Sequence, residues 1–178
     1  EEKKVYLAFN KPRGIVCTAE KREKNNVIDY LSYPVRIYPV GRLDKDSEGL
    51  LLMTNDGAIV NGIMRARNRH EKEYQVEVNK EITPEFLKKM ASGVPILDTV
   101  TRPCRIQKTG ERSFTIILTQ GLNRQIRRMC EALGYRVTKL KRVRIMNIHL
   151  KDLKTGEYRP LTEKELAELK KQIGEEKR

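Results

Sequence analysis

Apolar residues along the chain form two patterns that are typical of β-strands. Several short apolar runs are unbroken and end at turn-forming residues such as Pro, Gly or Asn-Asp-Gly, which indicates buried strands. Residues 73–78 alternate instead, so Tyr74 is predicted to point inward together with Val76 and Val78. Strands are predicted at residues 5–9, 50–53, 73–78, 103–107, 113–119 and 136–150.

Helices are predicted where capping residues bound a segment with helical spacing of apolar positions. The clearest is Leu122–Leu133, because Gly134 follows it as the kind of residue that ends helices in a left-handed conformation. The capping box Thr162-x-x-Glu165 predicts the start of a last helix. Earlier helices are predicted from Asn25 or Asn26 to Leu31, over residues 58–67, and from Thr83-Pro84 to Ser92, where Gly93 ends the helix.

The order of these elements predicts an α+β fold, because strands and helices do not alternate regularly and consecutive strands have short polar connections. The sheet is expected to be mainly antiparallel, with flanking helices. The 178 residues suffice for one catalytic domain, with possible lobes at residues 1–67 and 68–178. The sequence shows no internal repeat or low-complexity linker.

The net charge of +13 predicts a polyanionic partner, and nucleic acid is the first candidate. A membrane surface is the rival polyanion, but no apolar run approaches the roughly 20 residues of a spanning helix, and no signal peptide is evident. We therefore expect a cytoplasmic protein that does not bind membranes. The chain begins with Glu1 and not with Met, so it is either processed or a piece of something longer.

Basic residues are concentrated in residues 121–144, which contain eight Lys or Arg and one acid, Glu131. Such a run often lines only a solvated face. Most of the eight are Arg, however, and guanidinium groups pair with phosphate and stack on bases. On a helical wheel, Arg124 and Arg128 face away from the core and Arg127 lies at its border. This pattern suits RNA with unpaired nucleotides, although residue counts alone do not separate RNA from DNA.

The cysteines and histidines predict no metal site. Cys17, Cys104 and Cys130 are too far apart for a disulfide framework or a zinc site, so we interpret them as reduced packing residues. His70 and His149 each stand alone in the sequence. A metal site would have to be assembled entirely from distant parts of the chain.

The segment 41–49 is a charged loop between two apolar segments, and five of its nine residues are charged. One interpretation is a solvated polar loop. The other is an acid-based active site that uses Asp44, Asp46 or Glu48, and the residues by themselves do not choose among these three acids. Clustered carboxylates could also hold Mg²⁺ in a metal-dependent nuclease.

Four motifs occur in order and cover nearly the whole chain. They are Asn10-Lys11-Pro12-x-Gly14, Gly41-Arg42-Leu43-Asp44-x-x-Ser47-x-Gly49-Leu50, Lys72-Glu73-Tyr74 and Gly121-x-Asn123-Arg124-Gln125-Ile126-Arg127-Arg128-Met129. This series resembles the pseudouridine synthases that act on ribosomal RNA, in the branch that includes the small-subunit enzyme and the B, E and F enzymes of the large subunit. Residues 69–74, 92–96 and 144–147 look most like the F enzymes of that branch.

The resemblance implies a pseudouridine synthase fold with an active-site cleft between two lobes, and a reaction that needs no cofactor or metal. Asp44 matches the aspartate that attacks or deprotonates the target nucleotide, after which the base is detached, rotated and rejoined through carbon. Arg127 is the candidate guanidinium that keeps this carboxylate ionised. Tyr74 would lie against the uracil ring and help to remove the C5 proton. Arg42 would fill the gap left by the extruded base.

The resemblance also implies RNA as the partner, with large-subunit ribosomal RNA as the first candidate and transfer RNA as the second. Many relatives carry a small N-terminal RNA-binding domain of the ribosomal-protein-S4 type, and nothing in this chain corresponds to it. A monomer is expected. The residues expected to contact RNA are Lys11, Arg42, Arg124, Arg128, Lys139, Arg142 and Arg144.

The charge distribution supports a second hypothesis equally well, a non-catalytic RNA-binding or ribosome-associated module. Turnover of unmodified RNA distinguishes this module from an enzyme. The nuclease hypothesis differs in its product, because it predicts RNA cleavage and loss of activity with a chelator.

Overall fold

The chain forms two compact units in the computed structural model, which describes residues 3–176. The first unit comprises Glu1–Ala66 and Val143–Arg178, and the second comprises Arg67–Arg142. This division corrects the expected lobes, residues 1–67 and 68–178, because the chain returns to the first unit after Arg142.

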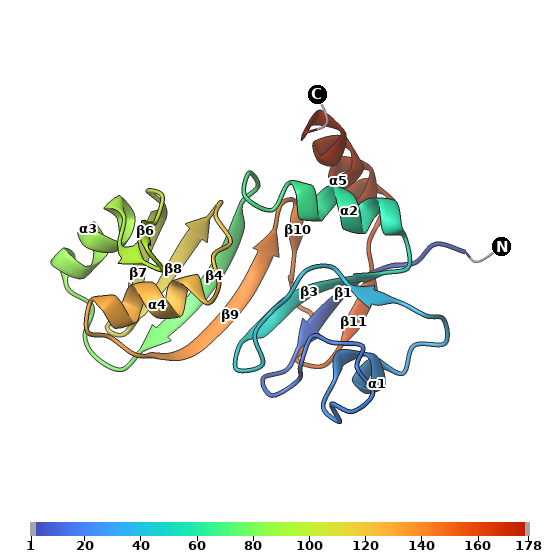
Figure 1. The fold of residues 1–178 in the computed structure, drawn as a ribbon, viewed down its shortest axis with the longest axis horizontal. Coiled ribbons are helices and arrows are strands. Elements are labelled where there is room, and N and C mark those ends of the chain that lie inside the picture. Colours follow the sequence, from blue (N-terminus) through green and yellow to red (C-terminus); the bar gives the residue numbers. More distant parts are fainter. Residues whose placement is uncertain (1–2, 177–178) are drawn as a thin grey trace. The chain divides into compact units, whose positions relative to one another are not determined.

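Most elements of both units are labelled in Figure 1. The first unit contains β1 (Tyr6–Lys11), α1 (Val27–Leu31), β2 (Tyr38–Pro39), β3 (Glu48–Thr54), α2 (Gly57–Arg65), β10 (Ile148–His149), β11 (Tyr158–Pro160) and α5 (Glu163–Glu176). The second contains β4 (Lys72–Val78), α3 (Pro84–Ser92), β5 (Pro95–Ile96), β6 (Thr99–Val100), β7 (Arg105–Gly110), β8 (Ser113–Leu118) and α4 (Gln125–Ala132). The division falls within β9 (Val137–Ile145). Within the described residues, no helix is long and apolar enough to cross a bilayer.

In the first unit, β1 lies between β11 and β3 and is antiparallel to both. Both faces of β1 are buried, as its unbroken apolar run predicts. Phe9 packs in one cluster with Val27 of α1, and Ala8 packs in another with residues of α2 and α5. Gly62 allows α2 and α5 to approach closely, because a Cβ there would lie 2.3 Å from Cγ2 of Ile173.

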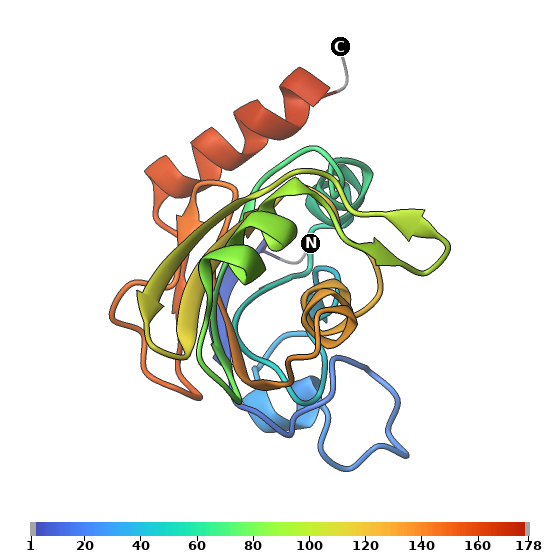
Figure 2. The same ribbon diagram turned by 90° about the vertical axis from the view of Figure 1, so that its left-hand side faces the viewer.

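In the second unit, the strands follow the order β9, β4, β8, β7, and β5 and β6 form a separate hairpin. Figure 2 shows α4 beside these strands. Apolar residues of α3 and α4 pack against Val76, Val78 and Phe114. The alternate residues of β4, Gln75 and Glu77, are exposed. The β4–β8 and β7–β8 pairs are antiparallel, and the predicted α+β fold with a mainly antiparallel sheet is confirmed.

The main local difference from prediction concerns the helix expected at 122–133. α4 begins only at Gln125, because Arg124 adopts the left-handed conformation with φ 49° and ψ 38°. Gly134 has φ 82°, as predicted for a residue that follows a helix. The strands that the sequence did not predict, β2, β5, β6 and β11, have two or three residues each, which is too short for a recognisable pattern.

The predicted capping box at the start of α5 is present. The Thr162 hydroxyl accepts a hydrogen bond from the Glu165 amide at 3.1 Å, and the Glu165 carboxylate accepts one from the Thr162 amide at 2.9 Å. Both carboxylate oxygens also accept from the Arg159 guanidinium, at 2.8 and 3.0 Å. These bonds, led by those from Arg159, lower the pKa of Glu165 to about 2 despite its burial.

Glu165→Gln should therefore lower the free energy of unfolding by about 2 to 3 kcal/mol at pH 7. A carboxylate whose pKa is depressed in the folded state stabilises the fold above its unfolded pKa. This contribution is lost as pH falls through the range from about 4.5 towards 2. Urea denaturation of both proteins across that pH range measures the difference.

Glu163→Gln is the matched control, because Glu163 is an exposed acid in the first turn of the same helix. It should change the free energy of unfolding by less than about 0.5 kcal/mol. Equal effects of the two substitutions would show that the Arg159 pair contributes nothing beyond helix-dipole stabilisation.

Candidate active site

Asp44 lies in the loop between β2 and β3, and the main chain around it is held on both sides. The preceding residue, Leu43, is buried in the core of the first unit. The Asp44 carbonyl accepts a hydrogen bond from the amide of Ser47 at 3.0 Å, which closes a turn around Lys45 and Asp46. Asp44 itself is half-buried.

Two segments from the start of the chain anchor this loop. The Gly14 amide donates to the Lys45 carbonyl at 2.7 Å, and the Cys17 thiol donates to the Leu43 carbonyl at 3.2 Å. Gly14 has φ 97°, a conformation that L side chains rarely adopt, so the predicted Pro-Gly turn is what brings its amide to the loop. Cys17 is a buried free thiol.

Lys11 is buried in the same unit, which corrects the expectation that it contacts RNA. Its side chain is 0% exposed, and its ammonium donates to the carbonyls of Pro12 and Ile15 at 2.9 and 2.8 Å. Burial lowers the pKa of Lys11, whereas electrostatic interactions with Cys17 and with the carboxylates of Asp44, Asp46 and Glu48 oppose this effect. Lys11 therefore supplies positive charge to the acidic loop from inside the unit. Its place at the end of a doubly buried strand was the signal in the sequence.

In the second unit, β4 presents Tyr74 as predicted. The ring is half-buried and packs against the cluster that contains Val76 and Val78. The register pairs Tyr74 with Ile116 of β8. The core therefore restricts the ring while one part of it stays accessible.

Arg127 is more deeply buried than its predicted position at the border of the core. Its exposed fraction is 7%, and it lies on α4 among the buried residues Ile126, Met129 and Cys130. Burial and the charge of Glu131 raise the pKa of Cys130 to about 12, and the positive charge of Arg127 partly opposes this. Cys130 is thus the inert packing residue that the sequence predicted.

The loop before α4 is shaped by Arg128. Its Nε donates to the Asn123 carbonyl at 3.0 Å and its Nη2 to the Asn123 side-chain oxygen at 2.9 Å. The next residue, Arg124, is exposed and holds its left-handed conformation without a side-chain cap. Arg128 therefore supports the loop, while Arg124 presents its side chain to solvent.

The residues expected to contact RNA differ in exposure and in the face they occupy. Arg42, Arg124 and Lys139 are exposed, Arg128 and Arg144 are half-buried, and Arg142 is buried like Lys11. Arg144 donates to the Met146 carbonyl at 2.9 Å.

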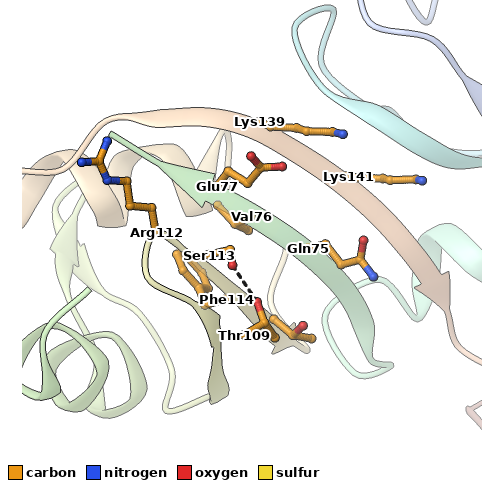
Figure 3. A pocket seen from close by; sticks show the side chains of 10 residues that line it. Gln75, Val76, Glu77, Thr109, Arg112, Ser113, Phe114, Lys139 and Lys141 are labelled. Atoms are coloured by element: carbon orange, nitrogen blue, oxygen red, sulfur yellow. Dashed lines mark hydrogen bonds between the residues drawn. The ribbon is translucent and has the colours of Figure 1, made fainter. Parts of the chain in front are cut away.

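Lys139 borders a hollow of about 400 Å³ with Lys141, Gln75 and Glu77. Figure 3 shows both ammonium groups extending from β9 in the same direction. Val76 and Phe114 also line the hollow, so its surface is partly apolar.

The three acids of the loop do not form a metal site. Among the described residues, no three His, Cys, Asp or Glu side chains are grouped so that they could hold a metal ion. Asp44, Asp46 and Glu48 are all half-buried, so exposure alone does not choose among them either.

Comparison with known proteins gives matches across most of the chain. Residues 5–132 match the family described as RNA pseudouridylate synthase. The dual-specificity RNA pseudouridine synthase RluF of Salmonella typhi is 56% identical, over 95% of this chain and 58% of its own length. The ribosomal large subunit pseudouridine synthase B of Bacillus subtilis is 36% identical, over 95% of this chain and 72% of its own.

A solved structure described as a pseudouridylate synthase has the same fold. Its TM-score is 0.86 at 30% identity, and the match covers 95% of this chain and 75% of that one. The chain spans 58% of the length of the Salmonella relative, so the comparison concerns one part of such a protein.

Arg124→Gly should leave the free energy of unfolding unchanged or raise it by up to about 1 kcal/mol, because glycine relieves the left-handed strain. RNA affinity should fall about fivefold, which corresponds to about 1 kcal/mol of lost phosphate interaction. Urea denaturation and fluorescence anisotropy with a labelled RNA stem-loop measure the two effects.

Leu97→Gly is the control for strain, because Leu97 is exposed and has φ 47° in the turn between β5 and β6. It should have a similar effect on stability and none on RNA affinity. A loss of more than about 1 kcal/mol in Arg124→Gly would indicate that the Arg124 side chain holds the loop together.

Proposed function

The chain belongs to the RNA pseudouridylate synthase family, and we propose that it converts a specific uridine in structured RNA to pseudouridine. The observation that carries this proposal is the extent of the family match. It spans residues 5–132 and so includes Asp44, Tyr74 and Arg127. The net charge of +13 supports a polyanionic substrate.

The reaction is an isomerisation, and its atoms balance without a co-reactant. The bond between C1′ of the ribose and N1 of the base breaks, and a bond from C1′ to C5 of the same base forms. C5 loses a proton and N1 regains one, so no electrons are added or removed. A carboxylate and groups that orient the base suffice for this chemistry, and we propose no cofactor.

Asp44 is the proposed catalytic residue, either as the nucleophile or as the base that starts detachment of the uracil. Three features of the first unit support this role. Leu43 and the Ser47 bond fix the backbone of Asp44, and the Lys11 ammonium acts on the carboxylates of the loop. A fixed carboxylate loses little freedom when it meets its substrate, which lowers the barrier.

Tyr74 and Arg127 are the two further residues proposed for the reaction. The core holds the Tyr74 ring in place, as stacking on a uracil requires. Burial of the Arg127 guanidinium is costly unless it is matched by anionic or polar partners. We propose that the Arg127 guanidinium is one of the groups that the reaction requires, as the resemblance to the family's third motif implies. Arg42, which is exposed, is proposed to replace the extruded base in its stack.

The proposed substrate is large-subunit ribosomal RNA, with transfer RNA as the second candidate. The Bacillus relative is named for the large ribosomal subunit, and the Salmonella relative is named for dual specificity. These names support ribosomal RNA as the substrate and are consistent with a second RNA substrate. With such substrates, the protein would act in the cytoplasm.

Asp44→Asn should abolish tritium release from RNA that carries uridine tritiated at C5, because the amide can neither attack nor accept a proton. RNA binding, measured by anisotropy, should be retained. Release at the wild-type rate would refute the role of Asp44, whereas absence of release by the wild type would favour the non-catalytic module.

Asp46→Asn and Glu48→Gln are the matched controls, because both remove one half-buried acid from the same loop. Each should keep most of the tritium release. If one of them abolishes release while Asp44→Asn does not, the catalytic carboxylate is that acid.

The substrate can be identified by mapping pseudouridines in cellular RNA from a strain that lacks the protein. We expect a pseudouridine to disappear from large-subunit ribosomal RNA and to return with the wild-type protein but not with Asp44→Asn. Disappearance from transfer RNA alone would overturn the choice of ribosomal RNA.

A further inference from the structure

Lys72, at the start of β4, has a side chain that the proposed chemistry does not use. Its ammonium donates to the carbonyls of Arg67 and Thr119. These carbonyls belong to the segment that precedes β4 and the segment that follows β8. The ammonium is therefore held in a fixed position in the second unit, between two main-chain segments.

The charges around Lys72 have the same sign as its own. Burial lowers the pKa of Lys72 to about 8, and the positive charges of Arg142, Arg102 and Arg67 add to this effect. No carboxylate contributes in the opposite direction. A bound anion beside Lys72 would offset this effect, because an opposite charge favours the charged form of the amine.

The acids closest to Lys72 in the chain do not offset its charge. The Glu71 carboxylate forms an ion pair with Arg105 at 2.7 Å. Glu73 follows Lys72 in the strand and so points to the other face of β4. On β8, the residue opposite Lys72 is the apolar Leu118.

Arg67 and Arg102 are exposed, and main-chain and amide groups organise the space around them. The Arg102 guanidinium donates to the Asn68 carbonyl, and the Arg102 amide donates to the Gln120 side chain at 3.0 Å. The Asn68 side chain accepts from the Gly121 amide at 3.1 Å. Across residues 3–176, neither arginine has an ion pair with a carboxylate.

Gly121 leaves the ammonium approachable. A Cβ at this position would lie 3.7 Å from the Lys72 Nζ and 3.8 Å from the Asn68 side-chain oxygen. Any other residue would place a side chain over this group. The cluster thus combines one fixed ammonium, two exposed guanidinium groups and an open approach.

We propose that Lys72, Arg67 and Arg102 form a binding site for a phosphate group of the RNA backbone. The ligand must carry negative charge and accept several hydrogen bonds, and phosphate oxygens do both. The inference rests on the proposed function in taking RNA as the ligand. The proposed site would contact the RNA backbone and not the base that reacts.

Proton uptake is the signature of this site. A phosphate beside Lys72 favours its charged form, so binding raises the pKa of Lys72 from about 8 towards its ordinary value. About half of the Lys72 side chains are protonated at pH 8 before binding, so RNA binding should take up as much as about half a proton. A lysine that only holds two carbonyls together would take up none.

The test is calorimetric titration of the wild-type protein with a short uridine-containing RNA stem-loop at pH 8. HEPES and Tris buffers differ in ionisation enthalpy, so the difference in apparent heat gives the number of protons taken up. We expect uptake by the wild type and none by Lys72→Met. Affinity should fall about tenfold in Lys72→Met, and the slope of log affinity against log salt should decrease by about 0.7 to 0.9.

Lys108→Met is the matched control, because the Lys108 ammonium also donates to a carbonyl of the same unit, that of Ile82, at 3.1 Å. It should keep the wild-type proton uptake, affinity and salt slope. The double variant Arg67→Gln, Arg102→Gln covers the case in which Lys72→Met does not fold, because both arginines are exposed. The slope of log affinity against log salt should also decrease in this variant.

Three results would overturn the proposal. The first is RNA binding by the wild type without proton uptake, and the second is an unchanged salt slope in the double arginine variant. The third concerns inorganic phosphate. Titration with inorganic phosphate alone separates the two sources of the ligand. Proton uptake with inorganic phosphate that does not compete with RNA would assign the site to the free ion and not to RNA. None of these measurements depends on pseudouridine formation, so they succeed or fail independently of the test of Asp44.

Discussion

The burial of the Lys11 ammonium beneath an acidic loop is the interaction on which the candidate site of the first unit depends. A lysine that is 0% exposed must satisfy its donors and balance its charge inside the protein. Two main-chain carbonyls accept hydrogen bonds from the ammonium. The carboxylates of Asp44, Asp46 and Glu48 contribute to the balance of its charge. Lys11 and the loop therefore stabilise each other, because removal of either leaves uncompensated charge in the interior.

The second unit also fixes cations through main-chain carbonyls, but with a different result. Lys72, Arg102 and Arg128 each donate to a carbonyl oxygen, which restrains the side chain without cancelling its charge. Around Lys11, acids offset the positive charge, whereas around Lys72 further cations add to it. Hydrogen bonds to carbonyls therefore hold Lys11 where acids balance its charge in the first unit. In the second unit, they hold Lys72 where neighbouring cations favour binding of an anion.

The sequence predicted features that depend on local patterns. Strand alternation placed Tyr74 on the inward face, and the capping box of α5 formed between Thr162 and Glu165. Features that depend on tertiary contacts were missed. The resemblance made Lys11 a candidate for RNA contact, although Lys11 ends a doubly buried strand and is itself buried. The helical wheel included Arg124, whose left-handed backbone ends that periodicity. The return of the chain to the first unit after Arg142 has no local signal at all.

The choice of Asp44 among three acids illustrates how structure adds to a motif. The resemblance to the family's second motif favours Asp44, and the exposure of the three side chains does not distinguish them. Their main-chain positions differ. Asp46 is a central residue of the turn and Glu48 begins a strand, whereas Asp44 follows a core leucine and closes the turn through its own carbonyl. A carboxylate that must reach one atom of a nucleotide benefits most from the position whose backbone is fixed before the substrate arrives.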